Sequence, residues 1–556
     1  MKKKGTNFIE QIIDGDLARG FKEKDLRFRF PPEPNGYLHI GHLKAICLNF
    51  NLGKKYRAPV NLRFDDTNPE KEAKEYVDAI KRDIKWLGFR WDKECYASDY
   101  FDLLHEWAVE LINKGKAYVD SQTSLEIADQ KGTPTKPGSE SPYRDRPVEE
   151  SLELFLKMKN GDFKQGEHVL RAKISMSSSN MLMRDPVIYR VINSPHPRTK
   201  NTWKIYPMYD WTHGESDYIE QVSHSLCTLE FKPHRDLYDW FLDQVVDKSK
   251  IRPKQREFAR LNLSHTITSK RKLLSLVEGG FVSGWDDPRM PTISGLRRRG
   301  YTPESLKKFV TTAGVAKREN IIEMSLLEFC IREDLNQKCN RLMVVQAPLK
   351  LTITNYPSDQ KEELMLVNNP ENPEAGSRSV IFSKEVYIEK TDFLEDPPKK
   401  YFRLSPGNEV RLKGAYIIKA EDIIKDSDGN IIEVICTYDP KSKSGSGSLE
   451  SQRKVKGTLH WVSCESNVPV EIREYDRLFE HPSPGDFSSD DLESAINKDS
   501  IKIFNGFGEE ELSNSDVMDS FQFQRKGYYI KDTDSTKDKH VFNKTVSLRD
   551  NWKKKN

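Results

Sequence analysis

One short segment, residues 30–42, constrains the fold of this 556-residue chain more than any other. It reads FPPEPNGYLHIGH and follows apolar residues at 26, 28 and 30 that alternate with arginines, a pattern typical of a β-strand. Prolines and a glycine then interrupt regular structure, and His39-Ile40-Gly41-His42 begins an apolar-periodic segment that predicts a helix. A strand, a tight loop and a helix start direct unpaired backbone N–H groups at an anion. A histidine pair at a helix start is also a common cap or surface feature, so these four residues leave both interpretations open.

A second segment, Thr268-Ser269-Lys270-Arg271, favours the phosphate-binding interpretation of the histidine pair. It follows LNL and precedes an apolar run, so a serine and a lysine on a loop can reach a triphosphate from its other side. The two segments resemble the HIGH and KMSKS signatures of class I aminoacyl-tRNA synthetases. The surrounding words RFPPEPNGYLHIGH, LRFDDTNP, YPMYDWTH, SHSLCTLEF and GWDDPRMPTISGLRRRGYTPES closely resemble the glutaminyl-tRNA synthetases, and the likeness extends from about Thr6 to Trp552.

Bulk composition excludes several classes of protein. Charged residues make up 31% and apolar residues 36%, which is typical of a soluble, folded chain of several domains. The net charge is only +3, so a nucleic-acid surface must come from local clustering. Seven scattered cysteines without a C-x-x-C pair argue against a disulfide framework or a zinc site. We found no apolar leader or membrane-spanning run, and therefore expect a cytoplasmic protein without a membrane partner.

The resemblance implies a multidomain fold that combines α/β and β parts. A Rossmann-type, parallel-sheet catalytic domain is expected in two halves, residues 1–99 and 209–260. An inserted α/β domain that binds the tRNA acceptor end is expected at 100–208, and a helical connector carrying the TSK loop at 261–340. Two antiparallel β-barrels that bind the anticodon are expected at 341–556, with the distal barrel at about 386–471.

Local patterns support this organisation. Residues 7–18 have apolar side chains at helical spacing, and Val60 to Phe64 alternate as a strand that ends in Asp65-Asp66-Thr67. We expect Asp66 or Thr67 to cap a helix over residues 69–86. Residues 131–150 are polar and rich in proline and glycine, which in isolation indicates a solvated loop. In TPES, Thr302 is the expected N-cap of the helix that follows.

From about Arg341 the pattern changes to short alternating strands separated by turn signals such as Asp428-Gly429. Many regular strands over some two hundred residues favour β-barrels or a sandwich, and the absence of a new catalytic constellation favours a binding module. The glycine- and serine-rich stretch at 441–448 is expected to be a flexible loop, either disordered or adjacent to RNA, with disorder favoured.

The family resemblance also assigns the catalytic chemistry. It implies that glutamine attacks the α-phosphate of ATP, and that the terminal ribose hydroxyl of tRNA then attacks the acyl carbon. Adenylate formation is expected only with bound tRNA, with Mg²⁺ entering with ATP. Glu33 and Glu72 are expected near the terminal ribose. The assigned catalytic residues are His39, His42 and Lys270; the assigned ATP-binding residues are Glu33, Pro34, Asn35, Gly41, His42, Arg260, Leu261, Ser269 and Lys270.

The choice of amino acid is expected to rest on Tyr209, His213 and Cys227. A phenol and a neutral thiol present dipoles without net charge, which suits a carboxamide better than a carboxylate. Discriminating glutamyl enzymes place an arginine where Cys227 stands; a small core cysteine is the alternative interpretation. The resemblance assigns Asp65 to the α-amino group, and Arg29 and Gln255 to the remaining contacts.

Anticodon recognition is assigned to Arg341, Arg403, Arg411 and Gln522, because arginine stacks on or hydrogen-bonds to splayed bases. The basic run at 297–299 is expected to meet RNA backbone. The chain departs from the family pattern at Thr268 in the signature loop, at Pro233 where some relatives read the acceptor stem, and at Phe402 before Arg403.

Three rival functions remain open at this stage. A glutamyl-tRNA synthetase of the archaeal and eukaryotic type shares most of these motifs. A small-molecule nucleotidyltransferase has no use for the β-region, and a non-catalytic RNA-binding paralogue has no need of His39, His42 and Lys270. We therefore expect tRNA(Gln), L-glutamine and ATP as partners, no protein-bound metal, and a monomer.

Overall fold

The computed structural model describes residues 5–247, 249–488 and 491–550, and its chain divides into two compact units. The first contains residues 1–262 and 310–322; the second contains residues 263–309 and 323–556. The chain passes between them at three elements: β10 (Asn262–Leu263), α11 (Pro303–Ala313) and β11 (Ile321–Ile322).

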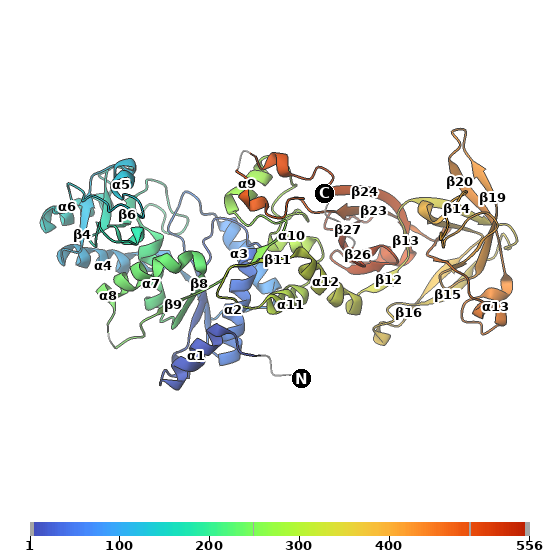
Figure 1. The fold of residues 1–556 in the computed structure, drawn as a ribbon, viewed down its shortest axis with the longest axis horizontal. Coiled ribbons are helices and arrows are strands. Elements are labelled where there is room, and N and C mark those ends of the chain that lie inside the picture. The colour runs from blue at the N-terminus through green and yellow to red at the C-terminus, as the bar shows by residue number, and fades with distance from the viewer. Residues whose placement is uncertain (1–4, 248, 489–490, 551–556) are drawn as a thin grey trace. The chain divides into compact units, whose positions relative to one another are not determined.

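The first unit, drawn mainly in blue to green in Figure 1, contains a parallel sheet with the strand order β1-β2-β3. Strands β8 and β9 form a second parallel pair, and the Ser223 amide joins it to the first set by donating to the Arg27 carbonyl at 3.0 Å. All five residues of β2 are buried, as expected for a sheet covered on both faces. The predicted nucleotide-binding sheet is thus confirmed. Its strands are β1 (Phe28–Phe30), β2 (Val60–Phe64), β3 (Glu94–Tyr96), β8 (His224–Thr228) and β9 (Lys254–Phe258).

Helix ends in this unit follow local capping chemistry. The helix predicted over residues 7–18 is α1 (Phe8–Ala18); it begins after Asn7, whose side chain accepts from the Ile9 and Glu10 amides. The prediction that Asp66 or Thr67 caps a helix over residues 69–86 was wrong. Helix α3 (Lys74–Trp86) begins after Ala73, and Asp66 instead accepts from the amide and hydroxyl of Ser98. Residues 69–73 therefore connect the strand to the helix rather than extending the helix.

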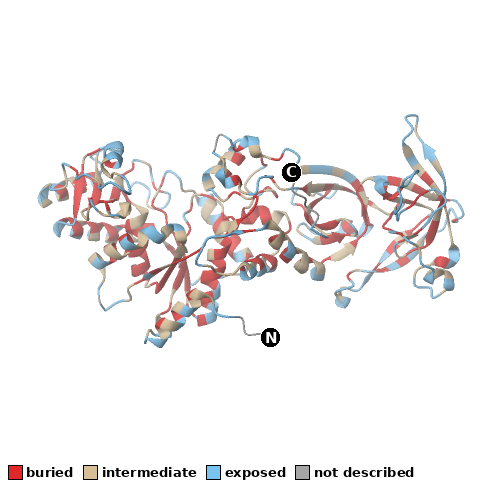
Figure 2. Ribbon diagram, viewed as in Figure 1, coloured by how far each residue is buried: buried red, intermediate tan, exposed pale blue. Residues whose placement is uncertain are grey.

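An antiparallel sheet interrupts the two parallel sets, as the predicted insertion requires. Its strand order is β4-β5-β6-β7, and buried side chains from α4 and α6 pack with it in one apolar core that includes Phe155 and Trp203 (Figure 2). The strands are β4 (Ala117–Asp120), β5 (Val169–Ala172), β6 (Val187–Val191) and β7 (Ile205–Pro207). The other helices are α2 (Ile40–Tyr56), α4 (Phe101–Asn113), α5 (Ser124–Gln130), α6 (Val148–Asn160), α7 (Tyr209–Ile219) and α8 (Arg235–Val245).

The second unit contains a seven-stranded sheet whose two edges are consecutive in the chain. Its order is β12-β25-β26-β27-β23-β24-β13, and only Met343 separates β12 from β13. The two edges must therefore meet, which makes the sheet barrel-like and removes its open edges. The strands are β12 (Asn340–Leu342), β13 (Val344–Val345), β23 (Val468–Tyr475), β24 (Ile501–Gly508), β25 (Ser520–Phe523), β26 (Gly527–Lys531) and β27 (His540–Ser547).

The second sheet of this unit closes in the same way. Its order is β21-β18-β19-β20-β14-β17-β22, and only His460 and the buried Trp461 separate its edge strands. A separate hairpin, β15 with β16, contributes buried residues to the same core. The strands are β14 (Pro348–Ile353), β15 (Glu362–Val367), β16 (Ser377–Phe382), β17 (Glu385–Glu389), β18 (Glu409–Leu412), β19 (Ile417–Lys425), β20 (Ile431–Tyr438), β21 (Thr458–Leu459) and β22 (Val462–Ser463).

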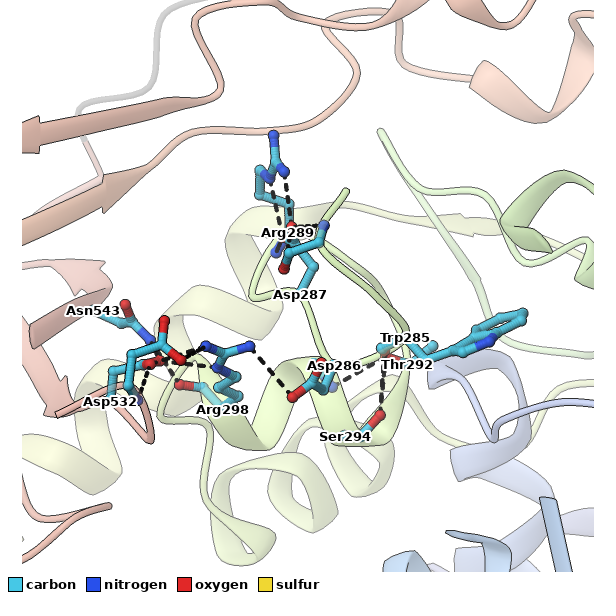
Figure 3. Close-up of polar contacts among 12 residues, drawn as sticks. Trp285, Asp286, Asp287, Arg289, Thr292, Ser294, Arg298, Asp532 and Asn543 are labelled. Atoms are coloured by element: carbon cyan, nitrogen blue, oxygen red, sulfur yellow. Dashed lines mark hydrogen bonds and ion pairs between the residues drawn. The ribbon is translucent and has the colours of Figure 1, made fainter. Parts of the chain in front are cut away.

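The helices of the second unit are α9 (Lys270–Glu278), α10 (Ile293–Arg298), α12 (Met324–Lys338) and α13 (Leu449–Gln452). The predicted cap of α11 is confirmed, because Thr302 Oγ1 accepts from the Ser305 amide at 3.1 Å. The basic run at 297–299 was predicted to meet RNA backbone, but Arg298 of this run is engaged within the protein. Its guanidinium donates to both oxygens of the buried Asp532 carboxylate, at 3.0 and 2.9 Å (Figure 3). A guanidinium held in a buried ion pair is unavailable to phosphate.

The helices of the described residues include none long and apolar enough to cross a membrane.

Candidate active site

The two histidines of the HIGH segment cap one helix together. His39 is the N-cap of α2; its Nδ1 accepts from the Gly41 amide at 3.1 Å, and His42 Nδ1 accepts from the His39 amide at 3.1 Å. A neutral imidazole that accepts at Nδ1 carries its proton at Nε2. Both interpretations of the pair thus apply at once: each ring caps the helix and presents an Nε2–H donor. The rings lie 3.9 Å apart between centroids.

The loop before α2 brings the predicted ATP-binding residues beside this helix start. The Asn35 side chain donates to Glu33 at 2.6 Å, and the buried Pro34 accepts from the Ala73 amide at 3.2 Å. Glu72, predicted near the terminal ribose, has a side chain that is only 4% exposed and accepts from the Asn68 amide at 2.6 Å. Burial raises the pKa of Glu72 to about 8, and burial raises that of Asp66 to about 7.

A buried charge cluster lies at the carboxyl ends of β1 and β2. Arg29 is fully buried; its Nε donates to Asp217 at 3.0 Å and its Nη1 to the Leu226 carbonyl at 2.8 Å. Arg63, also fully buried, donates to Asp65, Asp217 and Glu220. Two guanidinium groups thus face three carboxylates, so no positive charge in the cluster is left over.

Asp65 has the features expected of a ligand for an ammonium group. Its Oδ1 accepts from Arg63 Nε at 2.8 Å, whereas its buried Oδ2 has no hydrogen-bond partner among the described residues. Burial opposes ionisation, yet the charge of Arg63 and its hydrogen bond to Oδ1 outweigh it and lower the pKa of Asp65, whose Oδ2 lies 3.9 Å from His213 Nδ1. Asp65 is therefore an ionised carboxylate with one buried oxygen available to a cationic ligand.

Helix α7 supplies one wall of the pocket through a single stripe of residues. Tyr209, His213 and Asp217 are four residues apart and therefore share a helix face. The rings of Tyr209 and His213 stack with centroids 4.9 Å apart, and His213 Nε2 lies 3.0 Å from Arg29 Nη2. Burial raises the pKa of Tyr209 well above its usual value, so the phenol is neutral.

Strands β8 and β9 carry the other two predicted residues. Cys227 is partly buried, and burial raises the pKa of its thiol to about 12, so it remains neutral across the physiological range. Gln255 is buried and donates to the Phe231 carbonyl and to Glu257, both at 2.9 Å. The structure thus links four of the six predicted glutamine-binding residues, Arg29, Asp65, Tyr209 and His213, to the charge cluster or to one another. Among the described residues, Cys227 and Gln255, on β8 and β9, make no hydrogen bond to the charge cluster.

Sequence reasoning missed Arg63 and Asp217, which organise this pocket. Two signals were available. Arg63 is a charged residue inside an apolar strand and shares its face with Asp65, two positions on. Asp217 follows His213 at a spacing of four within a helix.

The signature loop and the adenosine-binding residues are divided between the two units. Arg260 and the buried Leu261 belong to the first, where Arg260 lies 3.8 Å from Glu319. Ser269 is the N-cap residue of α9 and Lys270 its first residue, both in the second unit.

The predicted anticodon residues differ in how far their polar groups are engaged. Arg403 is exposed, with Nη1 donating to the Thr391 carbonyl, and its neighbour Phe402 is 53% exposed. Arg341 donates to Asn336 at 3.2 Å, and Gln522 is buried and donates to Tyr528. Arg411 donates to carbonyl groups of Ser442 and Ser451. The stretch 441–448 is thus tied down by Arg411, so the prediction of disorder there was wrong.

Comparisons with known proteins agree with this geometry. Residues 25–337 match the family described as tRNA synthetases class I (E and Q), catalytic domain; residues 339–439 and 458–532 match its two anti-codon binding domains. The chain is 55% identical over 551 residues to the glutamine–tRNA ligase of Vibrio vulnificus, covering 99% of this chain and 98% of the relative. It is 51% identical over 551 residues to that of Nitrobacter hamburgensis, covering 99% and 97%.

A solved glutamate tRNA ligase from Elizabethkingia meningosepticum is 18% identical and covers 56% of this chain and 70% of its own, with a TM-score of 0.42, a likeness too low to support an argument.

The parallel sheet with its histidine-capped helix, followed by two barrel-like sheets, defines a class I aminoacyl-tRNA synthetase. Within that class the chain belongs to the family of tRNA synthetases for glutamate and glutamine (E and Q), where its relatives over the whole length are glutamine–tRNA ligases.

Proposed function

We propose that the chain ligates L-glutamine to the 3′-terminal ribose of tRNA(Gln) through glutaminyl-adenylate, consuming ATP and releasing AMP and pyrophosphate. The observation that carries the proposal is the set of predicted contacts around Asp65. Asp65 offers one carboxylate oxygen without a hydrogen-bond partner among the described residues, Tyr209 and Cys227 are neutral, and Arg29 is already paired with Asp217.

Asp65 holds the α-ammonium group of glutamine. Its unpartnered Oδ2 gains a charge-assisted hydrogen bond, which contributes about 1.5–3 kcal/mol. Arg63 and His213 keep this carboxylate ionised and oriented. The amino acid is thereby placed at the strand ends, where ligands of open α/β sheets bind.

The same pocket selects a carboxamide over a carboxylate. Arg29 and Arg63 are fully used by Asp65, Asp217 and Glu220, so a glutamate side chain finds no unpaired cation. Cys227 and Tyr209 supply only neutral dipoles. Burying an uncompensated carboxylate costs several kcal/mol, whereas a carboxamide needs only hydrogen-bond partners.

ATP is activated by positioning rather than by covalent chemistry. The start of α2 directs backbone N–H groups, and the Nε2–H groups of His39 and His42, at the phosphates. Lys270 neutralises charge on the departing pyrophosphate. Mg²⁺ that enters with ATP supplies further neutralisation of the triphosphate.

The second unit binds the anticodon arm of tRNA. Arg403 and Phe402 form an exposed pair of a cation and an aromatic ring, the combination that stacks on unpaired bases. All four predicted residues already have intramolecular partners, which for Arg403 are the Thr391 carbonyl and Asp392, so binding bases requires these contacts to exchange.

The test is tRNA-dependent ATP–pyrophosphate exchange, measured with glutamine and with glutamate on three proteins. Wild type should exchange with glutamine and only in the presence of tRNA. Cys227→Arg adds a cation and should lower the preference for glutamine over glutamate by at least about tenfold. Cys227→Ser is the neutral control and should retain the preference. A wild-type preference for glutamate would establish a glutamyl enzyme instead, and exchange with neither amino acid would overturn catalysis.

A further inference from the structure

A second cavity in the first unit lies on the face of α2 that is turned away from the histidine pair. Its volume is about 380 Å³, within the range of sites for small molecules. It is bounded by the start of α1, by the middle of α2 and by the segment around the end of α11, all parts of one unit. The lining residues of α2 are Lys44, Cys47, Leu48, Asn51, Leu52 and Lys55.

Lys44 is the unusual member of this lining. Its side chain is only 2% exposed, and across the described ranges 5–247, 249–488 and 491–550 it has neither a hydrogen-bond acceptor nor an ion-pair partner. Burial lowers its pKa, and no neighbouring carboxylate opposes that shift. An ammonium group buried without a partner costs free energy that folding must overcome elsewhere.

The one carboxylate in the lining is already used. Glu10 Oε2 accepts from the Asn7 amide at 3.0 Å, and its Oε1 lies 3.2 Å from Lys55 Nζ. No counter-ion for Lys44 is therefore available from the described protein around the cavity. The rest of the wall is mixed, with Leu48, Leu52, Val310 and Val315 providing apolar surface.

We propose that this cavity binds a small organic anion, with its oxyanion head on Lys44 and its aliphatic body against the leucine and valine side chains. The site lies outside the glutamine pocket and is independent of the proposed function. A carboxylate and a phosphate monoester share this head-group chemistry. Polynucleotide backbone does not fit, because Lys44 is almost wholly inside the protein.

The experiment is equilibrium dialysis of the full chain with radiolabelled butyrate or inorganic phosphate, with ATP and glutamine at saturation to fill the catalytic pocket. Butyrate or phosphate should bind with one equivalent per chain in wild type and in Lys54→Met, a matched change on the same helix outside the cavity lining. Lys44→Met should lose binding by about tenfold or more. Whichever probe binds more tightly identifies the head group.

Two measurements on wild type keep the test decisive if Lys44→Met does not fold. Neutral butyramide should compete with neither probe, and the apparent affinity for butyrate should fall as pH rises and Lys44 loses its proton. If Lys44→Met folds, it should melt at a higher temperature than wild type without ligand, because an unpaired buried charge is removed. Binding of butyramide equal to that of butyrate, retention of binding in Lys44→Met, or no binding of either anion at about 10 mM would overturn the proposal.

Discussion

Arg63 and Asp65, two residues apart at the end of β2, form a buried ion pair that uses only one oxygen of the carboxylate. The Arg63 Nε to Asp65 Oδ1 distance is 2.8 Å, and Oδ2 has no hydrogen-bond partner in the described part of the chain. The arginine therefore keeps the carboxylate charged and fixed while leaving its second oxygen for a ligand. This division separates the structural role of Asp65 from its binding role.

Asp65→Asn should weaken glutamine binding without unfolding the protein. Losing a charge-assisted hydrogen bond of about 1.5–3 kcal/mol raises the KM for glutamine by about 10- to 150-fold. Pyrophosphate exchange at varied glutamine measures this KM. Asp66→Asn is the matched control, since Asp66 bonds Ser98 instead, and it should leave the KM within about threefold of wild type. An equal effect of both substitutions would contradict the assignment.

His39→Asn should separate helix capping from catalysis. Asparagine is a good N-cap, so the melting temperature should stay close to that of wild type, whereas His39→Ala loses about 0.5–2 kcal/mol of stability. Both variants lack the Nε2–H donor and should lower kcat for exchange by about 10²-fold or more. Thermal melting and exchange kinetics on the two variants provide the measurement. A fully active His39→Asn would show that His39 serves only as a cap.

Glu72→Gln should change how stability depends on pH. The pKa of Glu72 is raised from 4.5 to about 8, so between these values the folded state holds a proton that the unfolded state has lost. The free energy of unfolding contributed by Glu72 is therefore fully present below about pH 4.5 and is lost as pH rises towards 8, by at most about 1.4 kcal/mol per unit. Glutamine keeps an acceptor for the Asn68 amide and removes the titration.

Urea denaturation near pH 5 and near pH 8 tests this expectation. The stability advantage of Glu72→Gln over wild type should grow towards pH 8. Glu70→Gln, the same change at an exposed position, should follow wild type at both values. If Glu72→Gln and wild type lose stability in parallel, Glu72 does not titrate in this range.

Asp532→Asn should destabilise the second unit strongly. Asp532 is fully buried and accepts from Arg298 and from the Asp534 amide, so the substitution leaves the Arg298 guanidinium without its buried counter-charge (Figure 3). Breaking such a pair costs about 3–5 kcal/mol. Asp534→Asn removes a 47% exposed partner of the same arginine and should cost less than about 1 kcal/mol. Urea denaturation of both variants measures the difference, which similar losses would contradict.

Local patterns predicted the elements whose causes are local. The alternation before residue 30 and over residues 60–64 predicted β1 and β2, and the helical spacing of apolar residues over 7–18 predicted α1. The predicted helix cap at Asp66 was wrong, because the Asp66 carboxylate accepts hydrogen bonds from Ser98 instead of from the amides of a helix start. The prediction of disorder at 441–448 was wrong for a similar reason. Arg411, thirty residues earlier, donates hydrogen bonds to this stretch, and its glycine and serine composition does not reveal such a contact.

By itself, the sequence determined the class of fold, the helix start proposed to bind phosphate, and the residue types proposed to contact the amino acid, because strand alternation, capping and motif spacing act over a few neighbouring residues. Only the tertiary structure decided which charges pair. Arg29 and Asp217 are 188 positions apart, yet their 3.0 Å contact pairs the cation that the proposed selectivity against glutamate requires to be unavailable. Burial, which sets the neutral state of Cys227 and leaves Lys44 without a counter-ion, depends on segments that meet only when the chain has folded.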